Sequence, residues 1–208
     1  MSECTNWFYD EKVKDHFFKP RNIFKSEDEI KNFNPDGIGM VGSPQCGDAM
    51  KFFIKVDKNT EKITDCKWQT FGCATAIAST SMFSEMIIGR TISDVFTITA
   101  KDIADKLGGI PAKKFHCSVL ADRAFREAVN DYYRKTGQED KVIEKKAAVI
   151  DAVLKITDAD IEHAVLDGAL TFEDVQKKTK VGVHDKDCIP KVKELIEKFK
   201  NKYFGEDD

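Results

Sequence analysis

The chain has 208 residues, of which 41% are hydrophobic and 33% are charged, and its formal net charge is −3. This balance favours a soluble folded protein and argues against a general nucleic-acid binder, which carries a basic excess or a basic face. No apolar run approaches the roughly 18 residues that a membrane span needs, and the start of the chain does not resemble a signal peptide. Six widely spaced cysteines favour a reducing cytoplasm over a disulfide scaffold.

The first half of the chain alternates between helical and strand patterns. Apolar residues at helical spacing before residue 18 predict a helix that Pro20 ends. Residues 21–41 are mixed and polar, with a turn at 34–37. Apolar residues then alternate with polar ones over 50–56 and 63–71, which predicts an antiparallel hairpin. The small, weakly polar residues that follow predict a buried helix over 74–88, ending at Gly89.

The second half reads as helical. Short helical turns are expected at 91–96 and 100–107, and Ser118 can cap an amphipathic helix that ends at Gly137. Beyond a polar stretch, further helices are expected at roughly 147–154, 158–166, 171–178 and 190–203, with Thr157 and Thr171 as capping residues.

These patterns predict an α+β fold with two domains. The first, residues 1–137, is a small antiparallel sheet packed by helices. A linker at 138–147 then leads to a small all-helical domain at 148–208.

A glycine- and proline-rich loop precedes the hairpin and carries a thiol and a carboxylate two residues apart. The loop runs from Gly42 through Cys46 to Asp48. Glycine and proline at this density indicate a shaped loop whose backbone approaches something closely. A cysteine there is a better ligand candidate than a cysteine in a core.

Two further cysteines stand at predicted helix starts. Cys73 follows Gly72 directly before one helix, and Cys117 follows His116 directly before another. Unpaired amides and the helix dipole favour a thiolate at such positions. We therefore expect Cys46, Cys73 and Cys117 to converge with Asp48 and His116 on one metal–sulfur site.

The residue types alone leave the occupant open. Three thiolates with a carboxylate or an imidazole suit either tetrahedral zinc or an iron–sulfur cluster, whereas any one of these cysteines by itself would more often be a core residue. A thiol enzyme with Cys117 as nucleophile and His116 as base is a third reading. Residues adjacent in sequence rarely face each other as such a pair. Cys4 and Cys66 read as an incidental terminal thiol and a strand-core residue.

Three motifs closely resemble the iron–sulfur scaffold family of IscU and the N-terminal domain of NifU. They are VGSPQCGD at 41–48, TFGCATAIAS at 70–79 and KFHCS at 114–118, and the opening helix at 9–17 is similar as well. The resemblance covers about residues 7–135. It implies a small antiparallel sheet packed by helices, in agreement with the pattern above.

The resemblance also implies a function and its residues. Cys46, Cys73 and Cys117 would bind a transient [2Fe-2S] cluster, Asp48 would tune its lability and His116 would be an auxiliary ligand. A cysteine desulfurase would deliver sulfur as persulfide to Cys117, a ferredoxin-type donor would supply electrons, and acceptor apoproteins would take the cluster. Such a scaffold is not an enzyme. Zinc at the same three cysteines, in a structural or regulatory protein, is the alternative, and both monomer and homodimer remain open.

One departure from the family concerns chaperone recognition. IscU-type members carry Leu-Pro-Pro-Val-Lys, whereas residues 110–114 here read IPAKK. This difference argues against dedicated handling by an Hsp70-type chaperone.

Residues 148–200 resemble the small helical [2Fe-2S] domain of bacterioferritin-associated ferredoxins, which also lies in the middle of NifU. That family implies a Cys-x-Cys pair and a Cys-x-x-Cys pair, which fall here on Asp151 and Val153 and on Asp185 and Cys188. Because three of four thiolates are absent, we expect a docking or packing module without a cluster. A partial metal site at His184 and Cys188 is the less favoured alternative.

Overall fold

The computed structural model describes residues 10–42, 48–110, 114–143 and 147–204, except for the side chains of His116 and Cys117. The chain divides into two compact units. Unit 1 takes its residues from Met1–Ile110 and Cys117–Ile143, and unit 2 from Pro111–His116 and Glu144–Asp208. In the part of the chain described, no helix is both long and apolar enough to cross a membrane.

Unit 1 is built on a three-stranded antiparallel sheet in the order β1-β2-β3. The strands are β1 (Gly37–Gly42), β2 (Ala49–Asp57) and β3 (Lys62–Phe71). The β2–β3 hairpin confirms the alternating pattern. Strand β1 was not predicted, because three of its 6 residues are glycines, which leave no apolar alternation to read.

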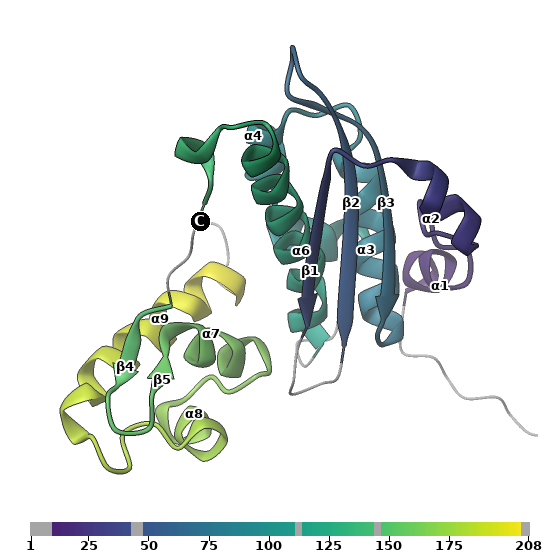
Figure 1. Cartoon of the computed structure of the whole chain (residues 1–208). Coiled ribbons are helices and arrows are strands. Elements are labelled where there is room, and N and C mark those ends of the chain that lie inside the picture. Colours follow the sequence, from purple (N-terminus) through teal and green to yellow (C-terminus); the bar gives the residue numbers. More distant parts are fainter. Residues whose placement is uncertain (1–9, 43–47, 111–113, 144–146, 205–208) are drawn as a thin grey trace, which may run out of the picture. The chain divides into compact units, whose positions relative to one another are not determined.

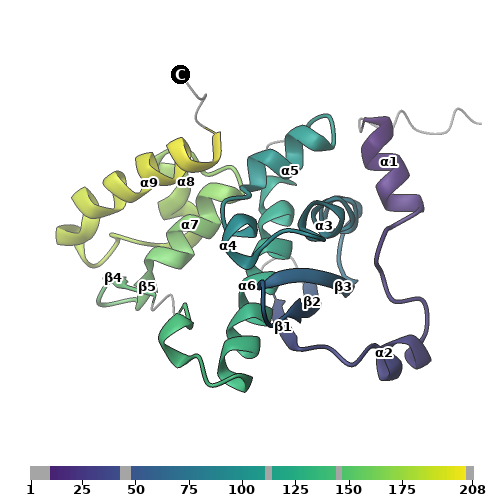
Figure 2. The same ribbon diagram turned by 90° about the horizontal axis from the view of Figure 1, so that it is seen from above.

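Two long helices cover one face of this sheet (Figures 1 and 2). They are α3 (Ala74–Ile87) and α6 (Phe115–Lys135). Between the helices and the sheet lies the main core, where aromatic rings meet edge to face. Its largest fully buried side chains include Trp68, Phe52, Phe83, Phe125, Ile54 and Leu107.

Shorter helices complete unit 1. They are α1 (Glu11–Phe18), α4 (Ile92–Val95) and α5 (Ala100–Lys106), with a 3-10 turn at Glu139–Lys141. Helix α2 (Glu27–Phe33) lies on the opposite face of the sheet from α3 (Figure 2), where Phe24, Phe33 and Phe53 form a small second core. The polar composition of 21–41 gave no indication of α2, which begins where the Ser26 hydroxyl accepts the N–H of Glu29 at 3.3 Å.

Helix α6 begins earlier than predicted. It starts at Phe115, so Ser118 lies inside the helix and is not its cap. The Ser118 hydroxyl is buried, and its oxygen lies 3.1 Å from that of Ser79 on α3. Ser118 therefore pairs with a residue of another helix, whereas the sequence had suggested that it caps its own helix.

Glycines on β1 allow α6 to pack directly on the backbone of the strand. A Cβ on Gly37 would lie 2.1 Å from the carbonyl oxygen of Ala128, and one on Gly39 would lie 2.0 Å from that of Ala124. No real Cβ tolerates such distances. The strand and the helix run in opposite directions, because the earlier residue of β1, Gly37, meets the later residue of α6, Ala128.

Unit 2 is mostly helical, which confirms the predicted fold class. Its helices are α7 (Asp158–Leu166), α8 (Phe172–Thr179) and α9 (Ile189–Phe204), with a 3-10 turn at Lys186–Cys188. Thr157 and Asp160 form the predicted capping box, and Thr171 caps α8. The core is apolar, and its buried members include Ile161, Val165, Val175, Val181, Val192, Leu195 and Ile196.

The helix expected at 147–154 is wrong. The segment forms a short hairpin of β4 (Val149–Asp151) and β5 (Ile156–Thr157). The Asp151 carboxylate accepts the N–H groups of Val153 and Leu154 at 3.0 and 2.9 Å, and Lys155 has a positive φ of 58°. A side chain that bonds to the backbone just after it favours a turn over a helix.

The packing of α6 on β1 can be tested at Gly39. We expect Gly39→Ala to destabilise unit 1 by about 1–3 kcal/mol, because the new methyl group overlaps a backbone oxygen that cannot rotate away. Gly42→Ala is the matched control on the same strand, since its nearest neighbouring atom would be 3.8 Å away. Urea unfolding followed by tryptophan fluorescence reports unit 1 alone, because Trp7 and Trp68 are the two tryptophans of the sequence. Equal midpoints for the two variants would contradict the close packing.

Candidate metal–sulfur site

Two of the three predicted cysteine segments meet at one end of the sheet. In the register of the strands, Gly42 pairs with Ala49 and Ala49 pairs with Phe71. The segment that holds Cys46 leaves the sheet at Gly42 and returns at Asp48. Cys73 follows two residues after Phe71, so it lies at the same end. Cys46 itself lies outside the described residues.

Cys73 is the N-cap residue of α3. It has extended backbone angles (φ −74°, ψ 168°) and is half-buried, and its carbonyl accepts the N–H of Ile77 at 3.1 Å. The positive end of the dipole of a 14-residue helix therefore lies at this thiol, which favours a negatively charged ligand set. This position confirms that Cys73 directly precedes a helix, as the sequence predicted.

The Asp48 side chain is buried against Gly72, the residue directly before Cys73. It is 8% exposed, and its carboxyl carbon lies 3.2 Å from where a Cβ of Gly72 would be. The Thr70 hydroxyl and the Ala76 methyl group close the same space at 3.2 and 3.3 Å from that position. Gly72 thus leaves room for the carboxylate directly before Cys73. The sequence singled out Asp48 and Cys73, but it did not show that Gly72 brings them together.

The first turn of α6 reaches the same end of unit 1. The Gly39–Ala124 contact fixes the two elements relative to each other. From there, Gly42 lies about 10 Å along the strand and Ser118 about 9 Å along the helix. The Ser118 hydroxyl also meets that of Ser79, one turn and a half beyond the start of α3. The expectation that Cys117 directly precedes the helix is wrong, because α6 already begins at Phe115 and the backbone of Cys117 lies in its first turn. The side chains of His116 and Cys117 lie outside the described residues.

Side chains from the N-terminal segment anchor α3, which sequence reasoning missed. The Ser81 hydroxyl lies 2.8 Å from Nδ1 of His16 and accepts the N–H of Arg21 at 2.8 Å. Burial, followed by the charge of Arg21, lowers the pKa of His16. The run of serine and threonine in α3 was the available signal, because buried hydroxyl groups require partners.

Cys66 has a different environment from Cys73. It is fully buried on β3, its thiol donates to the carbonyl of Ser84 at 3.4 Å, and burial raises its pKa. The prediction of a strand-core residue is confirmed. Cys4 lies outside the described residues.

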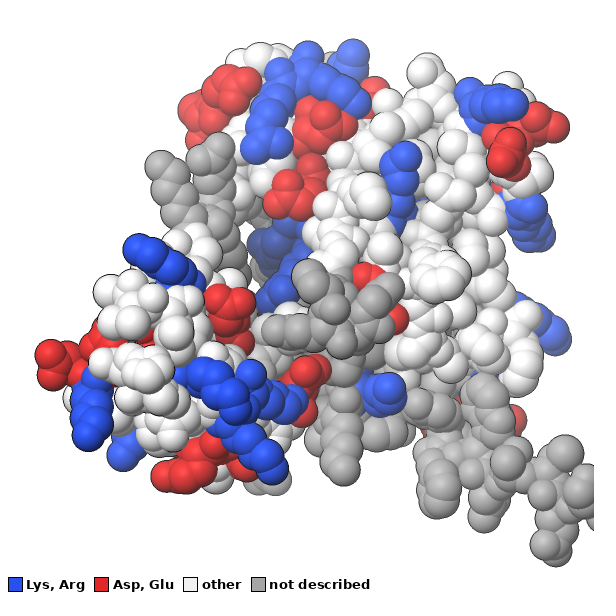
Figure 3. All heavy atoms as spheres, turned by 60° about the horizontal axis from the view of Figure 1, so that its bottom comes forward, with Lys and Arg blue, Asp and Glu red and all other residues white. Residues whose placement is uncertain are grey.

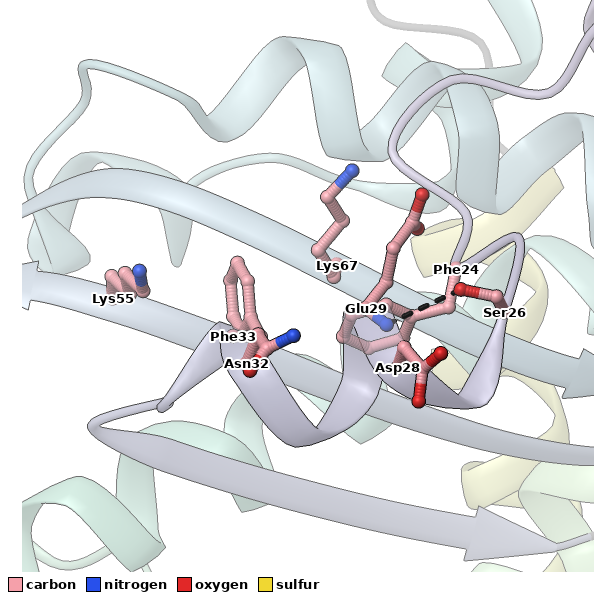
Figure 4. A pocket seen from close by; sticks show the side chains of 8 residues that line it. All are labelled: Phe24, Ser26, Asp28, Glu29, Asn32, Phe33, Lys55 and Lys67. Atoms are coloured by element: carbon pink, nitrogen blue, oxygen red, sulfur yellow. Dashed lines mark hydrogen bonds between the residues drawn. The ribbon is translucent and has the colours of Figure 1, made fainter.

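Other features of the described surface that could mark a second site are a hollow on the sheet and the distribution of charge. A hollow on the outer face of the sheet is lined by Phe24, Phe33, Lys55, Lys67 and residues of α2, with neither cysteine nor histidine among the lining residues (Figure 4). Acidic and basic side chains are interspersed on the face shown in Figure 3. Within the described side chains, no group of three or more His, Cys, Asp or Glu could hold a metal ion. Asp48 and Cys73 are the two members of the predicted ligand set that the structure places.

Comparison with known proteins finds a family for each of two parts of the chain. Residues 8–139 match the family described as the NifU-like N terminal domain, and residues 154–198 match the BFD-like [2Fe-2S] binding domain. A relative from Archaeoglobus fulgidus, the iron-sulfur cluster assembly scaffold protein IscU 1, is 51% identical over 136 residues, which are 65% of this chain and 84% of that protein.

A second relative is similar along both units. The nitrogen fixation protein NifU of Trichormus azollae is 35% identical over 195 residues, which are 93% of this chain and 65% of that protein. A crystal structure of a nitrogen-fixing NifU-like protein (N-terminal) from Brucella abortus covers 61% of this chain and 94% of that chain, with a TM-score of 0.47 and 15% identity. On the match over residues 8–139 and the identity to IscU 1, the chain belongs to the family of the NifU-like N-terminal domain.

Proposed function

We propose that this chain is a scaffold on which a labile [2Fe-2S] cluster is assembled and then passed to acceptor apoproteins. The observation that carries the proposal is the position of Asp48 against Gly72, directly before Cys73. Both lie at the end of the sheet where the Cys46 segment joins β1 to β2 and where α6 begins. Membership of the family supports the same function, because relatives are named as iron–sulfur scaffolds. Such proteins bind and release a cluster without catalysing a reaction of their own.

The proposed ligands are three thiolates with oxygen or nitrogen in support. Cys46, Cys73 and Cys117 hold the cluster, because iron–sulfur clusters are bound mainly through thiolates. Asp48 and His116 complete the set. A hard carboxylate is a weaker partner than thiolate for iron in a sulfide environment. Asp48 in place of a fourth cysteine therefore leaves the cluster exchangeable, which a scaffold requires.

Sulfur reaches the site as persulfide from a cysteine desulfurase. The Cys117 thiolate attacks the outer sulfur of the desulfurase persulfide. A new S–S bond forms on Cys117, and the desulfurase cysteine leaves as thiolate. Reducing two such sulfurs to sulfide takes four electrons. Oxidation of two ferrous ions to ferric supplies two of these electrons, and a ferredoxin-type donor supplies the other two. This chemistry fits a reducing cytoplasm, where thiols stay free.

Anaerobic reconstitution with iron, cysteine and a desulfurase tests the proposal directly. We expect visible charge-transfer absorption, a Mössbauer signal of a [2Fe-2S] centre and about two irons per chain. The reconstituted protein should then activate an apoferredoxin. A colourless product that retains one zinc per chain and transfers nothing would instead support a structural zinc protein with the same ligands.

The cysteine ligands can be tested one at a time. We expect a lower cluster yield for each of Cys46→Ala, Cys73→Ala and Cys117→Ala. The loss should be at least roughly 10-fold, because changes to residues that only support metal ligands already lower metal affinity roughly 10–100-fold. Circular dichroism should show nearly unchanged helical content. Cys4→Ala is the control that removes a thiol outside the proposed site, and it should assemble the cluster as the wild type does. Wild-type yield in any of the first three variants would remove that cysteine from the ligand set.

The role of Asp48 can be tested by the rate of cluster transfer. We expect Asp48→Ala to slow transfer to an acceptor by roughly tenfold, about 1.4 kcal/mol in barrier, because the labile oxygen contact is gone. Asp48→Asn is the matched variant, since it keeps the shape packed against Gly72 but removes the carboxylate charge. Slow transfer in both variants assigns the effect to the carboxylate. Transfer as fast as wild type in Asp48→Ala would exclude Asp48 from the mechanism.

A further inference from the structure

One buried carboxylate in unit 2 joins two loops. Asp151 ends strand β4, and its side chain is fully buried. One oxygen, Oδ1, accepts the backbone N–H groups of Val153 at 3.0 Å and Leu154 at 2.9 Å. The other, Oδ2, accepts the N–H of Gly182 at 3.0 Å from the loop after α8. Both carboxylate oxygens are therefore in use, and they connect residues about thirty positions apart.

A second carboxylate joins the same two loops in the opposite direction. Asp185, in the loop after α8, accepts the N–H of Ala152 through Oδ2 at 3.2 Å. Its own carbonyl oxygen accepts the thiol of Cys188 at 3.0 Å. Each loop thus provides a carboxylate for the backbone of the other. Two backbone N–H bonds to carboxylates therefore join the segments 151–154 and 182–188, while two further N–H bonds and one thiol bond lie within the segments.

This arrangement does not fit a [2Fe-2S] cluster, although residues 154–198 match a domain family described as binding one. Such a cluster is held by about four protein ligands, mainly thiolates. Cys188 is the only cysteine in residues 138–208, and it is buried with its thiol engaged. Burial, followed by the charges of Asp185 and Asp151, raises the pKa of the Cys188 thiol, which disfavours the thiolate that iron would need.

The two aspartates stand where the family resemblance aligns cluster cysteines. By the sequence resemblance, Asp151 takes the place of the first ligand of the Cys-x-Cys pair and Asp185 that of the first of the Cys-x-x-Cys pair; the family match itself covers residues 154–198. A bound cluster would tie these two loops through its ligands. Here direct hydrogen bonds from backbone N–H groups to the carboxylates make the same connection.

We propose that unit 2 is a cluster-free form of the BFD-like domain, in which the carboxylates of Asp151 and Asp185 hold together the loops that a cluster would otherwise join. Bonds from N–H groups to a charged carboxylate are about twice as strong as neutral ones, and this strength suits a structural tie. The full chain then assembles one cluster, at the site of unit 1. That last consequence rests on the proposed function.

The local geometry explains why the residue at 151 is an aspartate. The N–H bond from Leu154, with those from Gly182 and Val153, lowers the pKa of the Asp151 carboxyl and keeps it charged. An asparagine of the same shape accepts at one end only, so its amide group would face a backbone N–H at the other. Gly182, whose N–H bonds to Asp151, has a positive φ of 73°, and a Cβ there would lie 3.0 Å from Ile189. Residues other than glycine disfavour this backbone conformation.

The first experiment asks whether unit 2 binds iron. The full chain with Cys46→Ser, Cys73→Ser and Cys117→Ser is reconstituted anaerobically with iron and sulfide. We expect a colourless protein without stoichiometric iron. A visible charge-transfer band with about two irons per chain would overturn the proposal. If the wild-type chain also fails to assemble a cluster, the proposed function of unit 1 fails, and the second experiment still decides the proposal for unit 2.

The second experiment measures amide hydrogen exchange in the full chain. Asp151→Asn should speed exchange by at least about tenfold either at Gly182 or at Val153 and Leu154, because the amide keeps one accepting oxygen where the carboxylate has two. Asp187→Asn, an exposed charge change in the same loop, is the matched control and should leave the three rates unchanged.

Two further outcomes keep this test decisive. Wild-type protection at all three amides in Asp151→Asn would show that the carboxylate is not the tie, and the proposal would be wrong. If Asp151→Asn does not fold, Asp185→Ala removes the bond from Ala152, and faster exchange at Ala152 then supports the proposal while an unchanged rate refutes it. An iron chelator should not change any of these rates in the wild type.

Discussion

The close approach of helix α6 to strand β1 is the constraint on which the candidate site depends. Gly37 and Gly39 face the helix, and a methyl group on either would overlap a backbone carbonyl of α6. Contact at two successive points fixes both the distance and the relative position of the two elements. Because they run in opposite directions, the first turn of α6 comes to the end of the sheet where β1 stops. Side chains in place of these glycines would shift the first turn of α6 relative to this end of the sheet.

Helix α3 is held in place by hydroxyl groups as much as by apolar packing. Thr80 returns its hydroxyl to the carbonyl of Ala76 at 2.7 Å, Ser79 meets α6, and Ser81 meets the N-terminal segment. All three side chains are fully buried. Small side chains let neighbouring elements come close, and each hydroxyl needs a partner once it is buried. The helix that begins at Cys73 is thereby fixed from two sides.

The two units use buried carboxylates for different purposes. Asp151 has both oxygens occupied by backbone N–H groups, so its role is structural. Asp48 instead lies at the end of the segment that carries Cys46, against Gly72 and next to the N-terminus of α3, where Cys73 is half-buried. The same residue type thus ties loops in one place and is a candidate ligand in the other. The groups that surround each carboxylate make the difference.

The sequence by itself determined the elements with a clear local period and the chemistry of the site. Alternation predicted the β2–β3 hairpin, and helical spacing with threonine caps predicted α7 and α8 almost to the residue. The three cysteine motifs identified the family, and the count of cysteines excluded a four-thiolate cluster in unit 2.

Only the tertiary structure decided β1, the start of α6 and the hairpin at 149–157. Glycines in β1 carry no periodic signal, since their function is to be approached by a helix distant in sequence. The sequence suggested that Ser118 caps a helix, but the structure pairs it with Ser79 on α3. It also suggested that Asp151 lies in a helix, but the Asp151 carboxylate accepts the N–H of Gly182. For β1 and the start of α6 a contact between remote segments outweighs the local pattern. At Asp151 the remote bond from Gly182 adds to the local turn made with Val153 and Leu154.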